Sequence, residues 1–136
     1  MENVVLIIDD NRDTVDTLTA LFIQHGWLAE RAYNGRDGIE AVAQLMPKYV
    51  ISDLAMPGMS GFDVAEQLRR DYGDNCPFLI ALTAWDDPGV AVQAIAAGFS
   101  LVLNKPLEFN QLMSAMQIAP LAEAEVPLAP PPLPQS

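Results

Sequence analysis

The chain has 136 residues, the size of one ordinary domain, and 51% of them are hydrophobic, which is enough to build a buried core. Its net charge of −11 argues against direct binding of nucleic acid, because phosphate groups require a basic surface. The single cysteine, Cys76, excludes an intrachain disulfide and a CxxC metal site, and no apolar run is long enough to cross a bilayer.

Short apolar runs alternate with amphipathic stretches along most of the chain. In order, we expect strand 4–9, helix 12–25, strand 27–32, helix 35–46, strand 49–53, helix 62–71, strand 78–83, helix 88–97, strand 100–104 and helix 108–118. Runs as apolar as 78–83 are typical of strands buried on both faces of a parallel sheet. The alternation therefore predicts an α/β fold in which helices cover both faces of such a sheet.

Helical spacing and cap residues predict how these helices begin and which side they bury. Asn11 or Asp10 is a suitable N-cap for the first helix, and Asp87 followed by a proline suits the start of helix 88–97. The side chains expected to face the core are Val15, Leu18, Leu21 and Phe22 in the first helix, Ile39, Val42 and Leu45 or Met46 in the second, and Phe62, Ala65 and Leu68 in the third. Trp27 and Phe99 are expected to pack in the interior.

Polar residues stand at or just after the ends of four predicted strands: Asp9, Asp10, Asp53, Thr83 and Lys105. Ligands of open α/β sheets bind outside the carboxyl ends of the strands, so these side chains are expected to meet. Crowded carboxylates favour a cation, whereas a hydroxyl and an ammonium group suit an anion. The set fits Mg²⁺ beside a phosphoryl group. Taken alone, the aspartates are equally suited to start a helix or a turn.

Together these residues resemble the receiver domain of bacterial response regulators, the CheY-like superfamily of two-component signalling. The segments LIIDDN, ISDLAMPGMSGFD, ALTAW and LNKP carry the resemblance, which covers about residues 3–118. The separations of 43, 30 and 22 residues between Asp10, Asp53, Thr83 and Lys105 also fit that family. The resemblance implies a flavodoxin-like (βα)5 three-layer sandwich with a five-stranded parallel sheet in the order 2-1-3-4-5.

The resemblance also assigns roles. Asp53 would accept a phosphoryl group from a phosphohistidine and later lose it, a self-catalysed reaction without a separate metabolic substrate. Asp10 and Asp53 would ligate Mg²⁺ (or Mn²⁺) directly, Asp9 would act through a water molecule, and Ala55 would offer its backbone carbonyl.

The remaining implied roles concern the phosphoryl oxygens and the backbone. Lys105 would pair with these oxygens, and Thr83 would hydrogen-bond one of them. The peptide bond before Pro106 is expected to be cis, as it commonly is in this family. Gly58 and Gly61 are expected to supply special backbone angles after the phosphorylated aspartate.

Three positions depart from the family pattern. Val102 stands where receivers usually carry the Tyr or Phe of a rotameric switch, so the usual ring motion cannot occur. Ala55 has no polar side chain to position water. Trp85 is bulky, and one hypothesis is that it shields the acyl phosphate from hydrolysis. The alternative is a Trp that packs on the surface or faces a partner.

We therefore expect a phosphorylation-dependent switch in the cytoplasm, since the amino terminus lacks a basic leader. Expected partners are a histidine kinase or histidine phosphotransfer protein and a downstream protein target. The face formed by helix 88–97, strand 100–104 and helix 108–118 would bind the target or form a homodimer. Two alternatives stay open: a constitutive binding module that does not switch, and a receiver segment of a hybrid histidine kinase.

The chain changes character near residue 120. Six of its eleven prolines fall within 120–136, a stretch without basic residues. We therefore expect a receiver domain over 1–119 and an extended, disordered tail over 120–136. A linker to another domain and a polyproline ligand are the alternatives for this tail.

Overall fold

The computed structural model describes residues 3–105 and 108–116. The chain divides into two compact units, Met1–Pro106 and Leu107–Ser136, and each is described by itself. In the second unit, residues 109–116 form a helix, within the range expected for it. The expected cis bond before Pro106 and the proline-rich tail lie outside the described residues.

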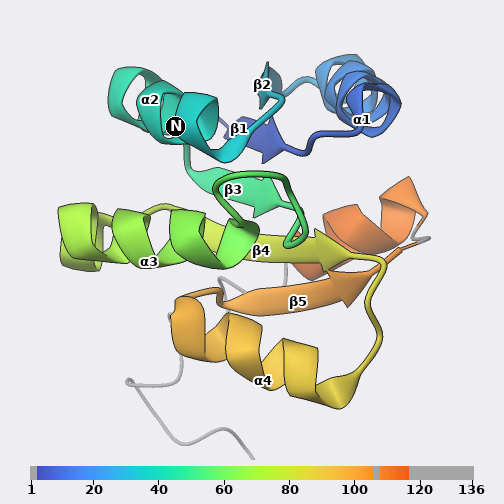
Figure 1. Ribbon diagram of the computed structural model, residues 1–136. Coiled ribbons are helices and arrows are strands. Elements are labelled where there is room, and N and C mark those ends of the chain that lie inside the picture. Colours follow the sequence, from blue (N-terminus) through green and yellow to red (C-terminus); the bar gives the residue numbers. More distant parts are fainter. Residues whose placement is uncertain (1–2, 106–107, 117–136) are drawn as a thin grey trace, which may run out of the picture. The chain divides into compact units, whose positions relative to one another are not determined.

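The first unit contains a parallel sheet with helices between its strands (Figure 1). Its elements are β1 (Val4–Ile8), α1 (Arg12–Gln24), β2 (Leu28–Ala32), α2 (Gly35–Leu45), β3 (Tyr49–Ser52), α3 (Gly61–Tyr72), the 3-10 helix η1 (Gly73–Asn75), β4 (Phe78–Thr83), α4 (Pro88–Ala97) and β5 (Leu101–Asn104). The five strands pair in the order β2-β1-β3-β4-β5, and every pair is parallel. The predicted fold and strand order are therefore confirmed.

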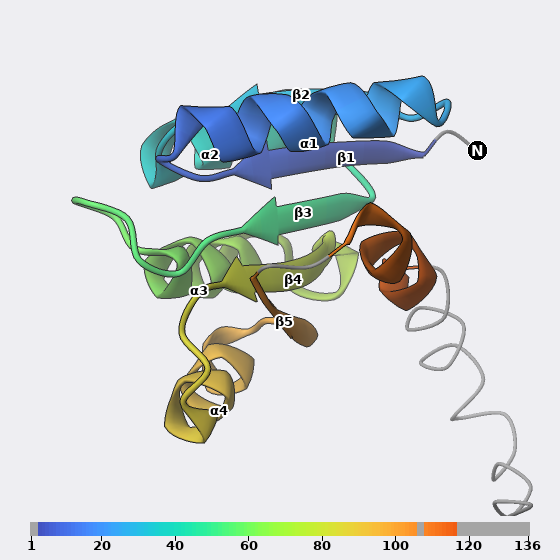
Figure 2. The ribbon, with the colours of Figure 1, turned by 90° about the vertical axis from the view of Figure 1, so that its right-hand side faces the viewer.

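Helices cover both faces of this sheet. Helix α1 lies on one face, and α2, α3 and α4 lie side by side on the other (Figure 2). The central strands β1, β3 and β4 are almost entirely buried, whereas the edge strands β2 and β5 are more exposed. Apolar side chains of the central strands hence form the core, which explains their nearly continuous hydrophobic sequences.

Side-chain caps set the starts of the helices. The Asn11 side chain accepts from the Thr14 amide before α1, and Asp87 caps α4 before its first-turn proline, both as predicted. Helix α3 begins one residue earlier than expected, because Ser60 and Asp63 form a capping box. This box fixes the point at which the loop after β3 becomes a helix.

The predicted inner faces are partly wrong. In α2, Val42 is buried as predicted and Ile39 packs against the core, whereas Leu45 and Met46 are exposed. The helix also buries Gly35 and Gly38, which were not predicted to face the core. A Cβ on Gly38 would lie 2.4 Å from Cδ1 of Ile8, so the absence of a side chain on Gly38 lets this helix approach β1 closely.

In α1, the polar Thr19 is fully buried, which the apolar pattern did not predict. Its hydroxyl donates to the Val15 carbonyl at 2.7 Å, which satisfies the buried polar group. Val15 and Phe22 are buried as expected, whereas Leu18 and Leu21 are only partly buried.

Aromatic rings line the amino end of the sheet, opposite the strand ends that carry the polar residues. Phe22 contacts Trp27, Trp27 contacts Tyr49, and Tyr49 contacts Phe78, with ring centroids 5.1, 5.5 and 5.9 Å apart. Trp27 is buried as expected, and so is Phe99. Among the described residues, no helix has both the length and the apolar character that crossing a membrane requires.

Candidate functional site

Asp9 and Asp10 directly follow β1, where the chain leaves the sheet to enter α1. Asp9 is 3% exposed, and its amide donates to the Ala32 carbonyl of the neighbouring strand at 3.2 Å. Its Oδ1 accepts from the Asn11 amide at 3.0 Å, whereas Asp10 is exposed. The turn into α1 thus holds one carboxylate inside the protein and the next at its surface.

Asp53 occupies the equivalent place after β3. Its amide donates to the Ile8 carbonyl at 3.0 Å, which fixes it beside the end of β1. The Leu54 amide donates to its Oδ1 at 2.8 Å. The first bond thus fixes the backbone of Asp53, and the second orients its carboxylate.

The start of α3 packs directly on the backbone of Asp53. A Cβ on Gly61 would lie only 2.0 Å from the Asp53 carbonyl oxygen, so no other residue fits at this position. Gly58 has a φ of +76°, as its expected role requires, but Gly61 does not lie among the positive-φ residues. The expectation for Gly61 is therefore corrected: it allows close approach rather than a left-handed angle.

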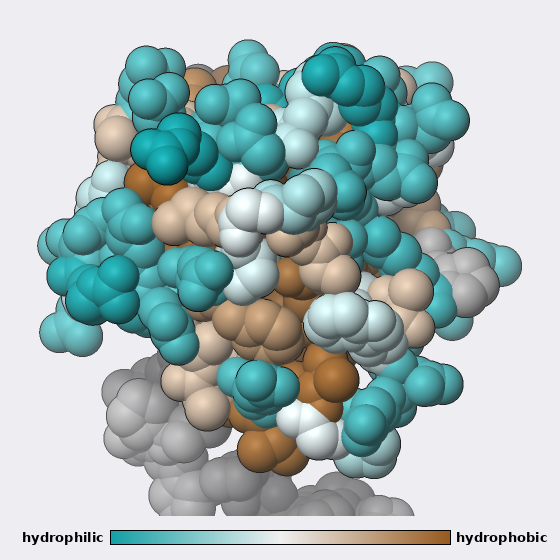
Figure 3. All heavy atoms as spheres, viewed as in Figure 1, coloured by the Kyte–Doolittle hydropathy of each residue, from teal (hydrophilic) through white to brown (hydrophobic). Residues whose placement is uncertain are grey.

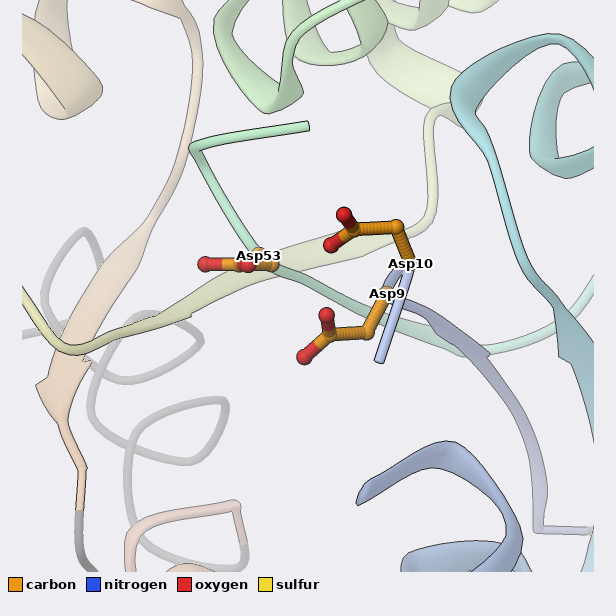
Figure 4. Close-up of side chains that lie close together, drawn as sticks. All are labelled: Asp9, Asp10 and Asp53. Carbon is orange, nitrogen blue, oxygen red and sulfur yellow. The ribbon is translucent and has the colours of Figure 1, made fainter. Parts of the chain in front are cut away.

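The three carboxylates form a compact acidic cluster. One oxygen from each of Asp9, Asp10 and Asp53 lies within 4.8 Å of the others, and their side chains converge in Figure 4. Carboxylate oxygens are the ligands preferred by Mg²⁺ and Ca²⁺, and mutual repulsion makes an ion-free cluster costly. The donor set therefore fits a hard divalent cation.

Lys105 reaches this cluster from the end of β5. Its Nζ donates to Oδ2 of Asp9 at 2.9 Å and lies 3.9 Å from Oδ2 of Asp53. The backbone amide of Lys105 donates to the Thr83 carbonyl at 2.8 Å, so the lysine is positioned by β4. One ammonium group thus balances part of the negative charge.

Thr83 ends β4 and is 1% exposed. Ser52 lies opposite Ala81 in the sheet, so Thr83 stands just beyond the register position of Asp53 on the adjacent strand. Its Oγ1 accepts from the Trp85 amide at 3.1 Å.

The other predicted residues lie around these groups. Ala55 is exposed in the loop after Asp53, and Val102 pairs with Ala81 and packs against the core. Trp85 is 46% exposed and lines an open hollow of about 410 Å³, whose described lining contains none of the three clustered aspartates. Pro106 lies outside the described residues.

Burial and neighbouring charge shift the protonation of Asp53. Desolvation, followed by repulsion from Asp9, raises the pKa of Asp53 from 3.8 to about 6. Lys105 and the Leu54 amide act in the opposite direction but do not outweigh these effects. A cation bound at the cluster would lower this pKa by favouring the ionised form.

Two asparagines of the site region were not predicted as part of it. Asn11 donates its amide to Asp9, and the Asn104 side chain donates to the Trp85 carbonyl at 2.5 Å. Their only sequence signal is that each lies next to a predicted site residue.

Comparison with known protein families identifies the family to which the chain belongs. The model of the response regulator receiver domain matches residues 5–117. The chain belongs to this family. Receivers act in two-component signalling, and phosphorylation of an aspartate is the function of the family. Receivers as a class interact with histidine kinases and downstream effectors.

Individual relatives agree with this assignment. Response regulator MprA of Mycolicibacterium vanbaalenii is 33% identical over 83% of this chain and 48% of its own length. Protein PilH of Pseudomonas aeruginosa is 31% identical over 82% of this chain and 93% of its own length. The receiver thus spans about half the length of MprA and nearly all of PilH.

The solved structures show the same fold. Chemotaxis protein CheY4 of Vibrio cholerae has a TM-score of 0.81 at 24% identity, over 86% of this receiver and 98% of that chain.

Proposed function

We propose that this receiver accepts a phosphoryl group on Asp53 from a phosphohistidine of a histidine kinase or phosphotransfer protein, and that phosphorylation alters a protein-binding face. The observation that carries the proposal is the meeting of Asp9, Asp10, Asp53 and Lys105 at one sheet edge. Groups that bind a cation lie there beside a carboxylate that can act as nucleophile and an ammonium group that can bind an anion.

Mg²⁺ (or Mn²⁺) is the proposed cofactor. Asp10 and Asp53 would hold it directly, with Asp9 acting through water and Ala55 through its carbonyl. When bound, the ion neutralises carboxylate charge and the charge of the phosphoryl oxygens. The exposure of Asp10 and the burial of Asp9 support this division, since an ion that keeps several waters needs one open side.

In the transfer step, a carboxylate oxygen of Asp53 forms a bond to phosphorus. The phosphorus–nitrogen bond to the donor histidine breaks, and the nitrogen leaves with the electron pair. Asp53 must be ionised to attack, and with a pKa near 6 it is mostly ionised at neutral pH. Lys105 would neutralise the phosphoryl oxygens, and Thr83 would donate its hydroxyl to one of them.

The output face is proposed to include α4 and β5 and to bind a downstream target or a second copy. Helix α4 contains no charged residue, and its Val92 and Ile95 are 70% and 51% exposed. Apolar surface gathers over this helix (Figure 3). Apolar side chains of this kind support protein contact. A cytoplasmic location is part of the proposal, because the donor kinase uses cellular ATP.

A second candidate is a constitutive binding module on the same fold. Val102 favours it, because a valine packed against the core cannot perform the ring motion of a tyrosine or phenylalanine. A receiver segment of a hybrid histidine kinase would use the first mechanism within a longer chain.

Incubation with a small phosphodonor and Mg²⁺, followed by mass spectrometry, tests the proposal. We expect one added phosphoryl group on Asp53, none in Asp53→Asn, and none after chelation of the metal. Asp63→Asn is the matched control, because Asp63 is an exposed capping carboxylate outside the acidic cluster. A protein that gains no mass would favour the binding module.

A further inference from the structure

The backbone of Trp85 is tied at both of its polar groups. Its amide donates to Oγ1 of Thr83 at 3.1 Å, and its carbonyl accepts from Nδ2 of Asn104 at 2.5 Å. Thr83 and Asn104 are opposite each other on β4 and β5. The loop that leads into α4 is therefore fastened to two neighbouring strand ends at the site.

Asn104 connects this loop to the lysine of the site. It directly precedes Lys105, and successive residues of an extended segment point to opposite sides. Lys105 accordingly reaches Asp9, while Asn104 reaches the carbonyl of Trp85. The Lys105 amide, bonded to the Thr83 carbonyl, holds this segment against β4.

The same side of β5 carries Val102, two residues earlier. Valine has no polar group and a stiff side chain, so it offers the β4–α4 loop neither a hydrogen bond nor a large rotation. Among the described residues of β5, Asn104 supplies the polar side-chain link to this loop.

We propose that Asn104 is a positioning residue that couples occupancy of the Asp53 site to the placement of Trp85 and the start of α4. This inference rests on the proposed function. A phosphoryl group would draw the ammonium of Lys105 and the hydroxyl of Thr83 toward its oxygens. Asn104 and the Thr83 hydroxyl would transmit that displacement to the backbone of Trp85. The indole, which lines the hollow with Asp86, Asp87 and Val90, would change its surroundings.

The test uses the fluorescence of Trp85 with Mg²⁺ and beryllium fluoride, an unreactive phosphoryl mimic. Fluorine NMR of the bound beryllium fluoride measures occupancy of the site independently of the fluorescence. We expect a fluorescence change in the wild type and its absence in Trp85→Phe, which assigns the signal to Trp85 rather than Trp27. Asn104→Leu keeps the approximate shape but removes the donor. This variant should lose about half or more of the Trp85 fluorescence change, while its affinity for beryllium fluoride should stay within about threefold of the wild-type value.

Asn104→Gln retains an amide donor and should restore part of the change. Asn104→Ala replaces the leucine variant if circular dichroism shows that the latter is unfolded. A fluorescence change of wild-type size in the variants without the donor would overturn the role of Asn104. So would a wild type that binds fluoride without a Trp85 signal. A wild-type protein that does not bind beryllium fluoride would instead overturn the proposed function, and the role of Asn104 with it.

Discussion

Asp53 combines burial with a neighbouring negative charge. These two effects raise its pKa to about 6, so an isolated carboxyl group is a poor guide to its behaviour. The residue types at the strand ends indicated a cation-binding pocket, but the sequence could not give the size of this shift. Burial and the position of Asp9 determine it, and both depend on the folded chain.

Mg²⁺ binding should therefore depend on pH near 6. Protonated Asp53 is a poor ligand, so affinity should fall as pH decreases through about 6, by roughly tenfold per unit well below it. Calorimetric titrations between about pH 5 and about pH 8 measure this dependence. In Asp53→Asn the dependence near 6 should disappear, and a wild-type affinity that is flat across this range would contradict the assignment.

Trp85 tests whether a bulky neighbour protects the acyl phosphate. If the indole limits access of water, Trp85→Ala should shorten the phosphoryl lifetime at Asp53 roughly fivefold, which corresponds to a hydrolysis barrier lower by about 1 kcal/mol. Decay of the phosphorylated protein, followed by mass spectrometry, gives the lifetime. Trp85→Phe, which keeps a ring, is the control, and an unchanged lifetime in Trp85→Ala would rule out shielding.

At the scale of elements, the loop from β3 to α3 depends on one close contact. Gly61→Ala would force a Cβ to within 2.0 Å of the Asp53 carbonyl oxygen, so we expect a loss of about 2 kcal/mol or more in unfolding free energy. Urea denaturation of each variant measures it. Gly89→Ala in α4 is the control, because its nearest contact is the Asp87 side chain at 3.4 Å, and it should change stability little. Equal effects of the two variants would contradict this account.

Element positions were predictable because hydrophobic runs, prolines and caps are local signals. Asp87 and the following proline fixed the start of α4. Val42 on the inner face of α2 followed from helical spacing, but the burial of Gly38 was not predictable, because Gly38 packs against Ile8 by having no side chain and so leaves no apolar signal. The contact of Asn104 with the loop before α4 escaped prediction for a similar reason: it depends on the path of that loop.

At the scale of the whole molecule, residues far apart in the sequence meet because the carboxyl ends of parallel strands lie at the same edge of the sheet. Apolar strands with intervening helices leave few topologies for a short α/β chain, which is why the order was predictable once the family resemblance was recognised. The interactions of Lys105 were less predictable. Its pairing with Asp9 at 2.9 Å and its longer distance to Asp53 follow from side-chain geometry.

The acidic cluster should also link metal binding to global stability. A carboxyl group whose pKa is raised on folding binds more protons in the folded state between its ordinary value and about 6, so without metal its contribution falls as pH rises through that window. Mg²⁺ should offset this loss and raise the melting temperature more at about pH 7.5 than at about pH 5. Thermal melts with and without Mg²⁺ measure the difference, and an equal shift at both pH values would contradict the linkage.

The most direct test is a crystal structure of this receiver with Mg²⁺ and beryllium fluoride. We expect beryllium bonded to a carboxylate oxygen of Asp53, with its fluorides in the place of phosphoryl oxygens. The metal should be held by Asp10, Asp53 and the Ala55 carbonyl, and Lys105 should have moved from Asp9 toward a fluoride. A metal bound elsewhere, or no beryllium fluoride on Asp53 at saturating concentrations, would contradict the proposed site.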